Sequence, residues 1–307
     1  MVGLARTVAK RMIARLGLAC DQAWSIGVLA GDSPERLDAP ASAPNPVLTP
    51  QDVTDVDASS VADPFVIRRR DAFAMFFEIL GREDRKGRIG LARSDDGLRW
   101  TYDCVVLEEP FHLSYPLVLA WKGDVLMLPE SHQSGRVTLY AADPFPTAWR
   151  PCATLLEGAY VDCTLFLSGS VWWLFACETG HDVLRLYRAE EPHGPFAEHP
   201  MSPIVAGDPH RARPAGRLRP LDGRLHRVSQ DCHPTYGLAV DLWEIAELTV
   251  DHYAEVHRRR ILRRGGWGWR RNGMHHIDAL EVEPGRWLAW VDGWRRQWSV
   301  RRRMEHP

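Results

Sequence analysis

Residues 113–131 read LSYPLVLAWKGDVLMLPES, and this stretch decides the fold because the chain repeats its pattern. An apolar run of strand-forming residues is followed by a Lys-Gly-Asp turn and a second apolar run. Related units begin at residues 61, 160, 211 and 274 and read VADPFVIRRRDAFAMFFEIL, YVDCTLFLSGSVWWLFACE, RARPAGRLRPLDGRLHRVSQD and MHHIDALEVEPGRWLAWVDG. The sequence therefore predicts five β-hairpins built on one repeat.

The spacing of these units favours a propeller. They recur at about fifty residues, with a longer last interval, which is a period typical of propellers, solenoids and arrays. A third strand also recurs, as GRIGLARS at 87, GRVTLYAA at 135 and DVLRLYRA at 182. About four short strands per unit indicate propeller blades. We predict an all-β, five-bladed β-propeller over residues 61–298, and we expect QAWSIGVLAG at 22–31 to join the last blade and close the ring.

The first twenty residues carry a pattern typical of a short amphipathic helix. Apolar residues recur at helical spacing, at Leu4, Val8, Met12 and Leu16. Basic residues occupy the other faces, which predicts either contact with an anionic membrane surface or packing on the protein's own domain or on a partner. We expect residues 21–60 to form a strand and a linker rich in Pro, Ala, Ser and Asp, and residues 299–307 to form a basic tail.

Composition argues against several classes of function. The net charge of −2 provides no basic field for nucleic acid. Six scattered cysteines without a C-x-x-C pair argue against a disulfide framework or a zinc site. No cluster has the spacing of a metal site, so we expect no metal and no cofactor. No apolar run reaches the roughly 18 residues of a spanning helix. We therefore expect a cytoplasmic protein, or one that is peripheral on the inner face of the membrane.

The repeat also places chemistry. In a propeller the first strand of each blade lines the central axis. Polar or aromatic residues occupy one aligned position of the five units, at Asp63, Tyr115, Asp162, Arg213 and His276. These side chains, which are far apart in the sequence, are therefore predicted to meet at one mouth of the axial channel.

The motifs ADPF…MFFE, HLSYPLVL…MLPES, YVDCTLF…WWLFA and RPAGR…QD…YG resemble the N-terminal domain of glucosamine inositolphosphorylceramide transferase, over roughly residues 20–295. That domain also occurs in bacterial polysaccharide-biosynthesis proteins. More distantly, the sequence is similar to the arabinanase, levansucrase and invertase superfamily of five-bladed propellers, which includes glycoside hydrolase families 43 and 32. The resemblance implies a carbohydrate-active protein.

The resemblance also implies catalytic positions. The hydrolases use three carboxylates, and Asp63 and Asp162 match the aspartates of the first and middle blades. Where family 43 has its acid glutamate this chain has Arg213, so simple hydrolysis lacks its usual proton donor. Glu130 or Asp231 would then supply the acid from a neighbouring strand. Structural alternatives are a turn at the strand start for Asp63, an ion pair with arginine for Asp162 and a solvated loop position for Glu130.

Other polar residues near the anchors are predicted to bind the substrate. The candidates are Tyr115, Arg213, Arg217, Gln230, Asp231, Tyr236, His276 and Trp267. The arginines suit a phosphate or a carboxylate, and Trp267 suits stacking on a sugar ring. His276 is favoured over His275, because neighbouring residues of a strand point to opposite faces. The alternatives are a salt bridge from Arg213 to an axial aspartate, buried-backbone hydrogen bonds and an exposed loop around Trp267.

Three functions are consistent with these residues, and each takes a sugar or sugar phosphate as its partner. The first is glycosyl transfer in cell-envelope polysaccharide or glycolipid biosynthesis, because a phosphate leaving group needs positive charge such as Arg213 more than a general acid. In it Asp63 is the base or nucleophile and Asp162 its charge partner. The second is hydrolysis of a furanoside or related glycan. The third is glycan binding without catalysis, which the separate glycosyltransferase domain of the plant enzyme favours.

Overall fold

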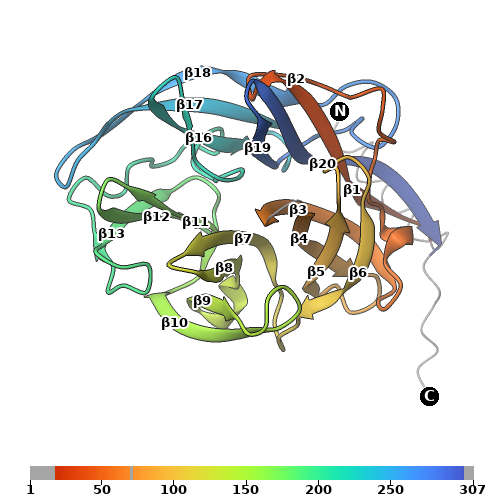
Figure 1. Cartoon of the computed structure of the whole chain (residues 1–307), viewed down its shortest axis with the longest axis horizontal. Coiled ribbons are helices and arrows are strands. Elements are labelled where there is room, and N and C mark those ends of the chain that lie inside the picture. Colours follow the sequence, from red (N-terminus) through yellow and green to blue (C-terminus); the bar gives the residue numbers. More distant parts are fainter. Residues whose placement is uncertain (1–17, 70–71, 301–307) are drawn as a thin grey trace, which may run out of the picture.

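The computed structural model describes residues 18–69 and 72–300, which form five antiparallel sheets of four strands each. Figure 1 shows the sheets arranged around one central axis, like the blades of a propeller. The predicted all-β, five-bladed propeller is therefore confirmed.

Four blades follow the order of the sequence. The first comprises β3 (Ala58–Arg69), β4 (Ala72–Gly81), β5 (Gly87–Ser94) and β6 (Thr101–Leu107). The second comprises β7 (Ser114–Trp121), β8 (Asp124–Glu130), β9 (Arg136–Ala142) and β10 (Trp149–Glu157). The third comprises β11 (Tyr160–Ser168), β12 (Val171–Glu178), β13 (Leu184–Ala189) and β14 (Ala197–Glu198). The fourth comprises β15 (Arg219–Leu221), β16 (Arg224–Asp231), β17 (Ala239–Leu248) and β18 (Tyr253–Arg263).

The fifth blade closes the ring with strands from both ends of the chain. Its order is β19 (Ile277–Glu283), β20 (Arg286–Val300), β1 (Leu18–Ser33) and β2 (Arg36–Asp38). The pairing of β1 with β20 runs from Leu18 opposite Val300 to Gly31 opposite Trp287. The expected closing strand at 22–31 is therefore confirmed. The propeller thus includes residues that the sequence analysis assigned to a separate strand and linker.

The helical segments in the described ranges are two single 3-10 turns, η1 (Pro50–Asp52) and η2 (His132–Ser134). Among the described residues no helix is long and apolar enough to cross a bilayer. The helix expected over residues 1–20 lies outside the described residues except for Leu18–Cys20, which begin β1. The basic tail expected over 299–307 also lies outside them beyond residue 300.

Aromatic pairs pack across the seams between blades, and several of the thirteen tryptophans take part in them. Edge-to-face pairs that join neighbouring blades include Phe76–Trp149, Trp121–Trp172 and Phe175–Tyr253, with ring centroids 5.2, 4.9 and 6.0 Å apart. Such pairs contribute about 0.5–1.5 kcal/mol each beyond their buried area. These tryptophans therefore stabilise the fold and are not available to bind sugars.

A β-bulge recurs at the axis in the first three blades. The pairing of the first with the second strand shifts register at Asp63 in β3, Tyr115 in β7 and Asp162 in β11. These three residues have positive φ angles of 54°, 44° and 49°. Non-glycine residues in the left-handed region are strained, and bulges re-aim side chains beside active sites. In these three blades the aligned anchor is therefore the bulge residue of the axial strand, whereas Arg213 and His276 precede the strands β15 and β19.

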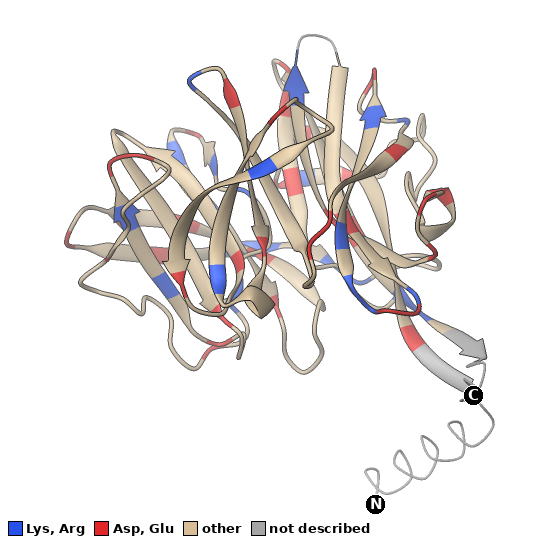
Figure 2. Cartoon of the chain, turned by 90° about the horizontal axis from the view of Figure 1, so that it is seen from below, with Lys and Arg blue, Asp and Glu red and all other residues tan. Residues whose placement is uncertain are grey.

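The antiparallel order gives the propeller two different faces. One face, here called the mouth face, carries the connections between successive blades and those between the second and third strands of a blade. The opposite face carries the turns between first and second and between third and fourth strands. The β1–β20 pair projects from the mouth face, below the disc in Figure 2.

Candidate active site

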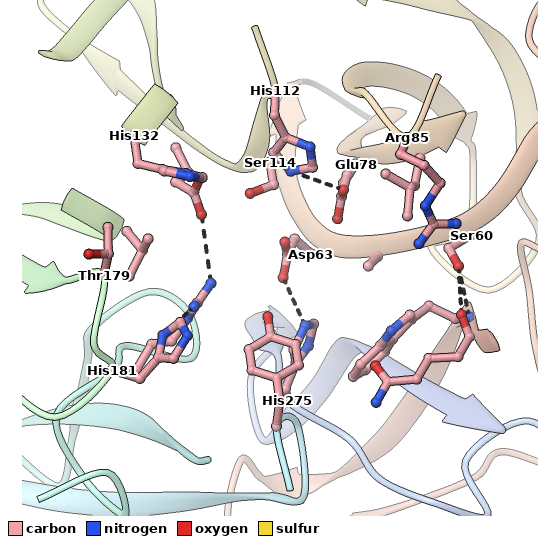
Figure 3. A pocket seen from close by; sticks show the side chains of 18 residues that line it. Ser60, Asp63, Glu78, Arg85, His112, Ser114, His132, Thr179, His181 and His275 are labelled. Atoms are coloured by element: carbon pink, nitrogen blue, oxygen red, sulfur yellow. Dashed lines mark hydrogen bonds and ion pairs between the residues drawn. The ribbon is translucent and has the colours of Figure 1, made fainter. Parts of the chain in front are cut away.

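A cavity of about 410 Å³ lies at the axis, and all five blades contribute to its wall (Figure 3). Its titratable lining comprises three carboxyl groups, four histidines, two arginines and a tyrosine: Asp63, Glu78, Glu130, His112, His132, His181, His275, Arg85, Arg213 and Tyr236. Most of these residues come from axial strands or from connections on the mouth face. Four of the predicted site residues line this cavity, namely Asp63, Glu130, Arg213 and Tyr236.

Asp63 stands at the β3 bulge and is only 4% exposed. Its Oδ2 accepts the backbone N–H of Tyr115 at 3.3 Å. Its Oδ1 lies 3.9 Å from His275 Nε2 and 3.8 Å from His276 Nδ1, and Figure 3 shows Asp63 between Glu78 and His275. Burial raises the pKa of Asp63 well above its usual range, although the nearby His275 opposes this effect. The environment favours a neutral acid over the predicted nucleophile or base.

Asp292 on β20 holds His275 in place. Its carboxylate accepts the backbone N–H groups of Asp63, His275 and His276 at 3.0, 3.1 and 3.0 Å. Its Oδ2 lies 2.7 Å from His275 Nδ1, and the imidazole stacks on Trp24 with ring centroids 4.0 Å apart. Burial opposes protonation of His275, but the charges of Asp292 and Asp63 outweigh it and raise its pKa. The second nitrogen of this oriented histidine faces Asp63, as in an acid–base relay.

Two glutamates in the wall have opposite protonation tendencies. Glu78 on β4 lies 3.3 Å from His112, and burial, followed by the charge of Glu130, raises its pKa to about 8. Glu130 is also buried, but His132 Nδ1 lies 2.5 Å from its Oε1 and Arg213 lies 3.6 Å from its Oε2. These partners outweigh desolvation and lower the pKa of Glu130. Near neutral pH one carboxyl is protonated while the other is ionised.

Arg213 is the centre of a buried polar network. Its Nε and Nη2 donate to Asp162 at 2.6 and 3.1 Å, and its Nη1 lies 2.6 Å from His181 Nδ1. Gln230 donates to the same Asp162 at 2.5 Å and to the carbonyl of Pro214 at 2.9 Å. The salt bridge proposed as an alternative for Arg213 is therefore present. Asp162 and Gln230 lie behind the cavity wall and position the arginine.

Tyr115 and Arg217 do not line the cavity. The Tyr115 hydroxyl accepts the backbone N–H of Gly216 at 2.8 Å and contacts Thr164 Oγ1 at 2.9 Å. Arg217 pairs with Asp278 at 3.0 Å and donates to the carbonyl of Val118. Both residues join neighbouring blades at the axis, so the structure gives them positions that support the fold.

Asp231 and Trp267 also lie outside the cavity. Asp231 is 3% exposed and is paired with His210 at 2.9 Å and Arg260 at 2.6 Å. Trp267 is 89% exposed in the connection between β18 and β19. Asp231 is therefore engaged by His210 and Arg260 outside the cavity wall, and the Trp267 indole is exposed in a connection that does not line the cavity.

The structure corrects the choice between the adjacent histidines. His276 is fully buried, and its Nε2 lies 3.0 Å from the carbonyl oxygen of Pro64, while His275 lines the cavity. The strand alternation invoked for this choice does not apply, because both residues precede β19, which begins at Ile277. Burial lowers the pKa of His276 to about 4, so it is a neutral core histidine.

Several cavity residues were missed from the sequence. His112, His132 and His181 lie in connections on the mouth face, outside the repeated motif. Glu78 was also missed, although a glutamate recurs near the end of the second strand in the first three blades, at Glu78, the predicted Glu130 and Glu178. Glu178, the third member, does differ, because it pairs with Arg185 at 2.7 Å and is 39% exposed. The recurrence of a glutamate at this position in the first two blades was therefore the available signal.

Three buried residues are close enough to be considered as metal ligands. Ligand atoms of Asp63, His275 and Asp292 lie within 4.8 Å of one another. However, Asp292 already faces His275 Nδ1 and accepts three backbone N–H groups, which leaves Asp63 Oδ1 and His275 Nε2 as free donors. Two donors are fewer than a structural or catalytic zinc site uses. The arrangement fits proton transfer better than metal binding.

Comparisons with known proteins agree with this architecture. Solved structures with the same fold include Zg3597, a family 117 glycoside hydrolase from Zobellia galactanivorans (TM-score 0.54, 13% identity, covering 78% of this chain and 88% of that one). They also include an exo-1,5-alpha-L-arabinanase from a bovine ruminal metagenomic library (TM-score 0.54, 11% identity, covering 79% and 93%). At these identities the likeness establishes a shared propeller fold.

Sequence comparison identifies the family. The model for "Glucosamine inositolphosphorylceramide transferase 1, N-terminal" matches residues 19–294. The protein of that name from Oryza sativa subsp. japonica is 36% identical over 297 residues, covering 88% of this chain and 40% of the relative. The Arabidopsis thaliana protein is 32% identical over 295 residues, covering 88% and 39%. The chain thus spans about 40% of the length of these relatives. It belongs to the family of glucosamine inositolphosphorylceramide transferase 1 N-terminal domains.

Proposed function

We propose that the axial cavity is the active site of a carbohydrate-active enzyme that transfers a glycosyl group in glycolipid or cell-envelope polysaccharide biosynthesis. The names of the relatives suggest a glucosamine-type sugar as the donor group and an inositolphosphorylceramide-type lipid as the acceptor. The donor would be a sugar activated by phosphate.

One observation carries this proposal, namely the two wall glutamates whose pKa values are pushed apart. Glu78 has a pKa of about 8, whereas the pKa of Glu130 is lowered by His132 and Arg213. Pairs of carboxyl groups with separated pKa values are the usual arrangement of acid and base at glycosyl centres. A cavity used only for binding has no need of a protonated and an ionised carboxyl on the same wall.

The proposed step uses Glu130 as the base. Glu130 takes the proton from the acceptor hydroxyl, and the acceptor oxygen forms its bond to the anomeric carbon. The bond from that carbon to the phosphate oxygen breaks, and its electron pair leaves with the phosphate. Glu78 and the neutral Asp63 donate hydrogen bonds to the sugar or to the departing oxygen.

Arg85 replaces Arg213 as the proposed phosphate ligand. Asp162 and His181 already engage Arg213. Arg85 is exposed at the cavity rim, and its Nη1 donates only to Ser59 Oγ at 3.2 Å. Among the described residues no carboxylate is in ion-pair contact with this guanidinium, so it can form a charge-assisted pair with phosphate.

The test is a turnover screen of the purified protein. Nucleotide sugars and sugar phosphates are incubated with inositolphosphorylceramide in detergent micelles, and products are identified by mass spectrometry. Glu130→Gln should lower the rate by at least about 100-fold, as expected for loss of a general base. Glu157→Gln, at an exposed outer strand, is the matched control and should retain full activity.

A second candidate function is glycan binding without catalysis. This chain spans about 40% of the length of the relatives. Catalysis in those proteins need not reside in the matched region, which supports a binding role. Saturation-transfer NMR with the same sugars separates the two. A binding role would be favoured over catalysis if no donor is turned over and if Arg85→Ala weakens sugar binding while Glu130→Gln does not. Release of free sugar from aryl glycosides would instead favour the hydrolase.

A further inference from the structure

An arginine-rich surface lies on the mouth face beside the cavity. The segment 256–273 reads VHRRRILRRGGWGWRRNG and contains no acidic residue. It forms the end of β18 and the connection to β19. With the neighbouring end of β20 it contributes six arginines, at Arg263, Arg264, Arg270, Arg271, Arg295 and Arg296. This set, together with Trp267, is called the arginine–tryptophan surface below.

The connection is held in one conformation by a different tryptophan. Trp269 packs so closely on β1 and β20 that a Cβ atom added to Gly27 would lie 2.4 Å from its ring, and one added to Gly293 would lie 2.7 Å away. The loop is fastened further by Asn272 N–H to the carbonyl of Trp294, at 2.9 Å. Because the loop is anchored in this way, the Trp267 side chain stays exposed to solvent and does not fold back onto the protein.

Trp267 is the most exposed large apolar residue in the described chain, with 89% of its surface accessible. The Arg271 guanidinium lies over its ring, 5.0 Å from the centroid. An indole left in water forgoes the hydrophobic stabilisation that its burial would provide. An anchored loop that presents tryptophan beside arginine is the arrangement that proteins use at the boundary between lipid and water.

The charges of this surface are not neutralised by ion pairs with the residues that the structure describes. Earlier in β18, Arg258 pairs with Glu244 and Arg260 pairs with Asp231 and Asp241. By contrast, none of the six arginines of the arginine–tryptophan surface has an ion-pair partner among the residues that the structure describes. The whole chain has a net charge of −2, so the positive field of the six arginines is local to this surface.

The surface is continuous with the cavity wall. Gly273 bridges to Trp294 on β20, whose indole N–H donates to the carbonyl of Gly237 at 3.0 Å. Trp294 lies 6.1 Å from Trp24, and Trp24 lines the cavity. The β1–β20 pair leaves the disc on this same face, as Figure 2 shows. A flat partner seated on the arginine–tryptophan surface would therefore face the cavity mouth.

We propose that the arginine–tryptophan surface docks on an anionic lipid bilayer and holds the mouth face against the membrane. Arginines near a lipid surface bind anionic headgroups, and Trp267 enters the interfacial layer. Nucleic acid would also attract arginines, but the single exposed indole of Trp267 does not provide a groove in which successive bases stack. The docking does not rest on the proposed reaction, so the two proposals can fail separately.

The test is vesicle flotation of the full chain. The probes are phosphatidylcholine vesicles with and without about 30 mol % phosphatidylserine, a content at which the surface potential attracts basic residues. The wild-type chain should float with the anionic vesicles, and about 0.5 M NaCl should release it. The combined variant Arg263→Ala, Arg264→Ala, Trp267→Ala and Arg271→Ala should lower the partition coefficient by at least about tenfold.

Two controls keep the result specific. Arg36→Ala with Arg286→Ala and Val250→Ala removes two exposed arginines and an exposed apolar residue from turns on the opposite face, and it should bind like the wild type. A second control replaces Arg6, Lys10, Arg11 and Arg15 by glutamine, which separates the N-terminal segment from the arginine–tryptophan surface. All variants should show the thermal unfolding midpoint of the wild type.

Several outcomes would overturn the proposal. It fails if the wild-type chain does not bind anionic vesicles, or if the surface variant binds them as tightly as the opposite-face control. It also fails if the glutamine variant of the N-terminal segment alone abolishes binding while the surface variant changes nothing. Equal binding to neutral vesicles would show that charge does not direct the docking. Loss of turnover with intact flotation would affect only the proposed reaction.

Discussion

Asp162 holds Arg213 in a buried two-point ion pair, with Nε 2.6 Å from Oδ2 and Nη2 3.1 Å from Oδ1. The pair joins the axial strand of the third blade to the entry of the fourth. It also fixes the guanidinium 3.6 Å from Glu130. Arg213 lines the cavity and Asp162 does not. The charge state of the cavity therefore depends on a residue that lies outside its wall.

Removing one partner of this pair should be costly. Arg213→Ala leaves the Asp162 carboxylate buried without its cation, so we expect the free energy of unfolding to fall by about 3–5 kcal/mol. Denaturant unfolding measures this. The control is Arg150→Ala, whose pair with Asp143 is 64% exposed on both sides and should contribute less than about 1 kcal/mol. Equal effects of the two substitutions would contradict the assigned role.

Glu78 should make stability fall as the pH rises. Its ordinary pKa is 4.5, whereas burial and the charge of Glu130 raise it to about 8 in the folded protein. Between these values the folded state binds the additional proton, so the contribution of Glu78 to stability is largest below pH 4.5 and is lost as the pH rises toward 8. One proton corresponds to at most about 1.4 kcal/mol per pH unit.

The comparison with Glu78→Gln isolates this contribution. Unfolding free energies measured from pH 5 to 8 should decline more steeply for the wild type than for the variant. A carboxyl titration followed by carbon NMR checks the same group directly. Parallel stability curves for the two proteins would show that Glu78 ionises normally and would remove it as the acid.

Asp292 should control the protonation of His275. Asp292→Asn keeps the size of the side chain and one acceptor oxygen but removes the negative charge 2.7 Å from the imidazole. The pKa of His275 should therefore fall, because burial then opposes protonation with less compensation. Titration of the imidazole by nitrogen NMR measures the change. Asp251→Asn, an exposed substitution on the opposite face, should leave this titration unaltered; a similar shift there would indicate a general charge effect.

Gly216 is required where the chain enters the fourth blade. Its φ is +143°, and a Cβ atom would lie 1.9 Å from the carbonyl oxygen of Ile277. Gly216→Ala should therefore destabilise the fold by about 3 kcal/mol or prevent folding, because backbone must move. Gly123→Ala is the matched control, since its φ is +94° but nothing lies within 4 Å, and it should cost about 1–2 kcal/mol from backbone strain alone. Thermal unfolding distinguishes the two, and comparable losses would show that the contact is relieved cheaply.

The sequence alone determined the architecture of this protein. The repeated hairpins, with apolar runs and Gly-Asp or Asp-Gly turns, specify each blade through local contacts, and the period specifies their number. The same repeat located Asp63, Tyr115 and Asp162, because the bulge at the axial strand recurs at the same place in the first three units. Ring closure by residues 22–31 was also predictable, because the fifth unit lacks two strands that the N-terminal segment supplies.

Only the tertiary structure decided which side chains face the cavity and in which charge state. His112, His132 and His181 come from connections whose sequences do not repeat, so no internal comparison placed them. His275 lines the cavity and His276 is buried, because both residues lie in irregular backbone before β19, where strand alternation does not apply. Glu78 and Glu130 occupy equivalent positions on the second strands of their blades, yet their pKa values diverge. Burial and the charge of Glu130 raise the pKa of Glu78, whereas His132 and Arg213 lower that of Glu130. Protonation depends on burial and on charges brought together from different blades, and such long-range neighbours are fixed by the closed ring and not by local sequence.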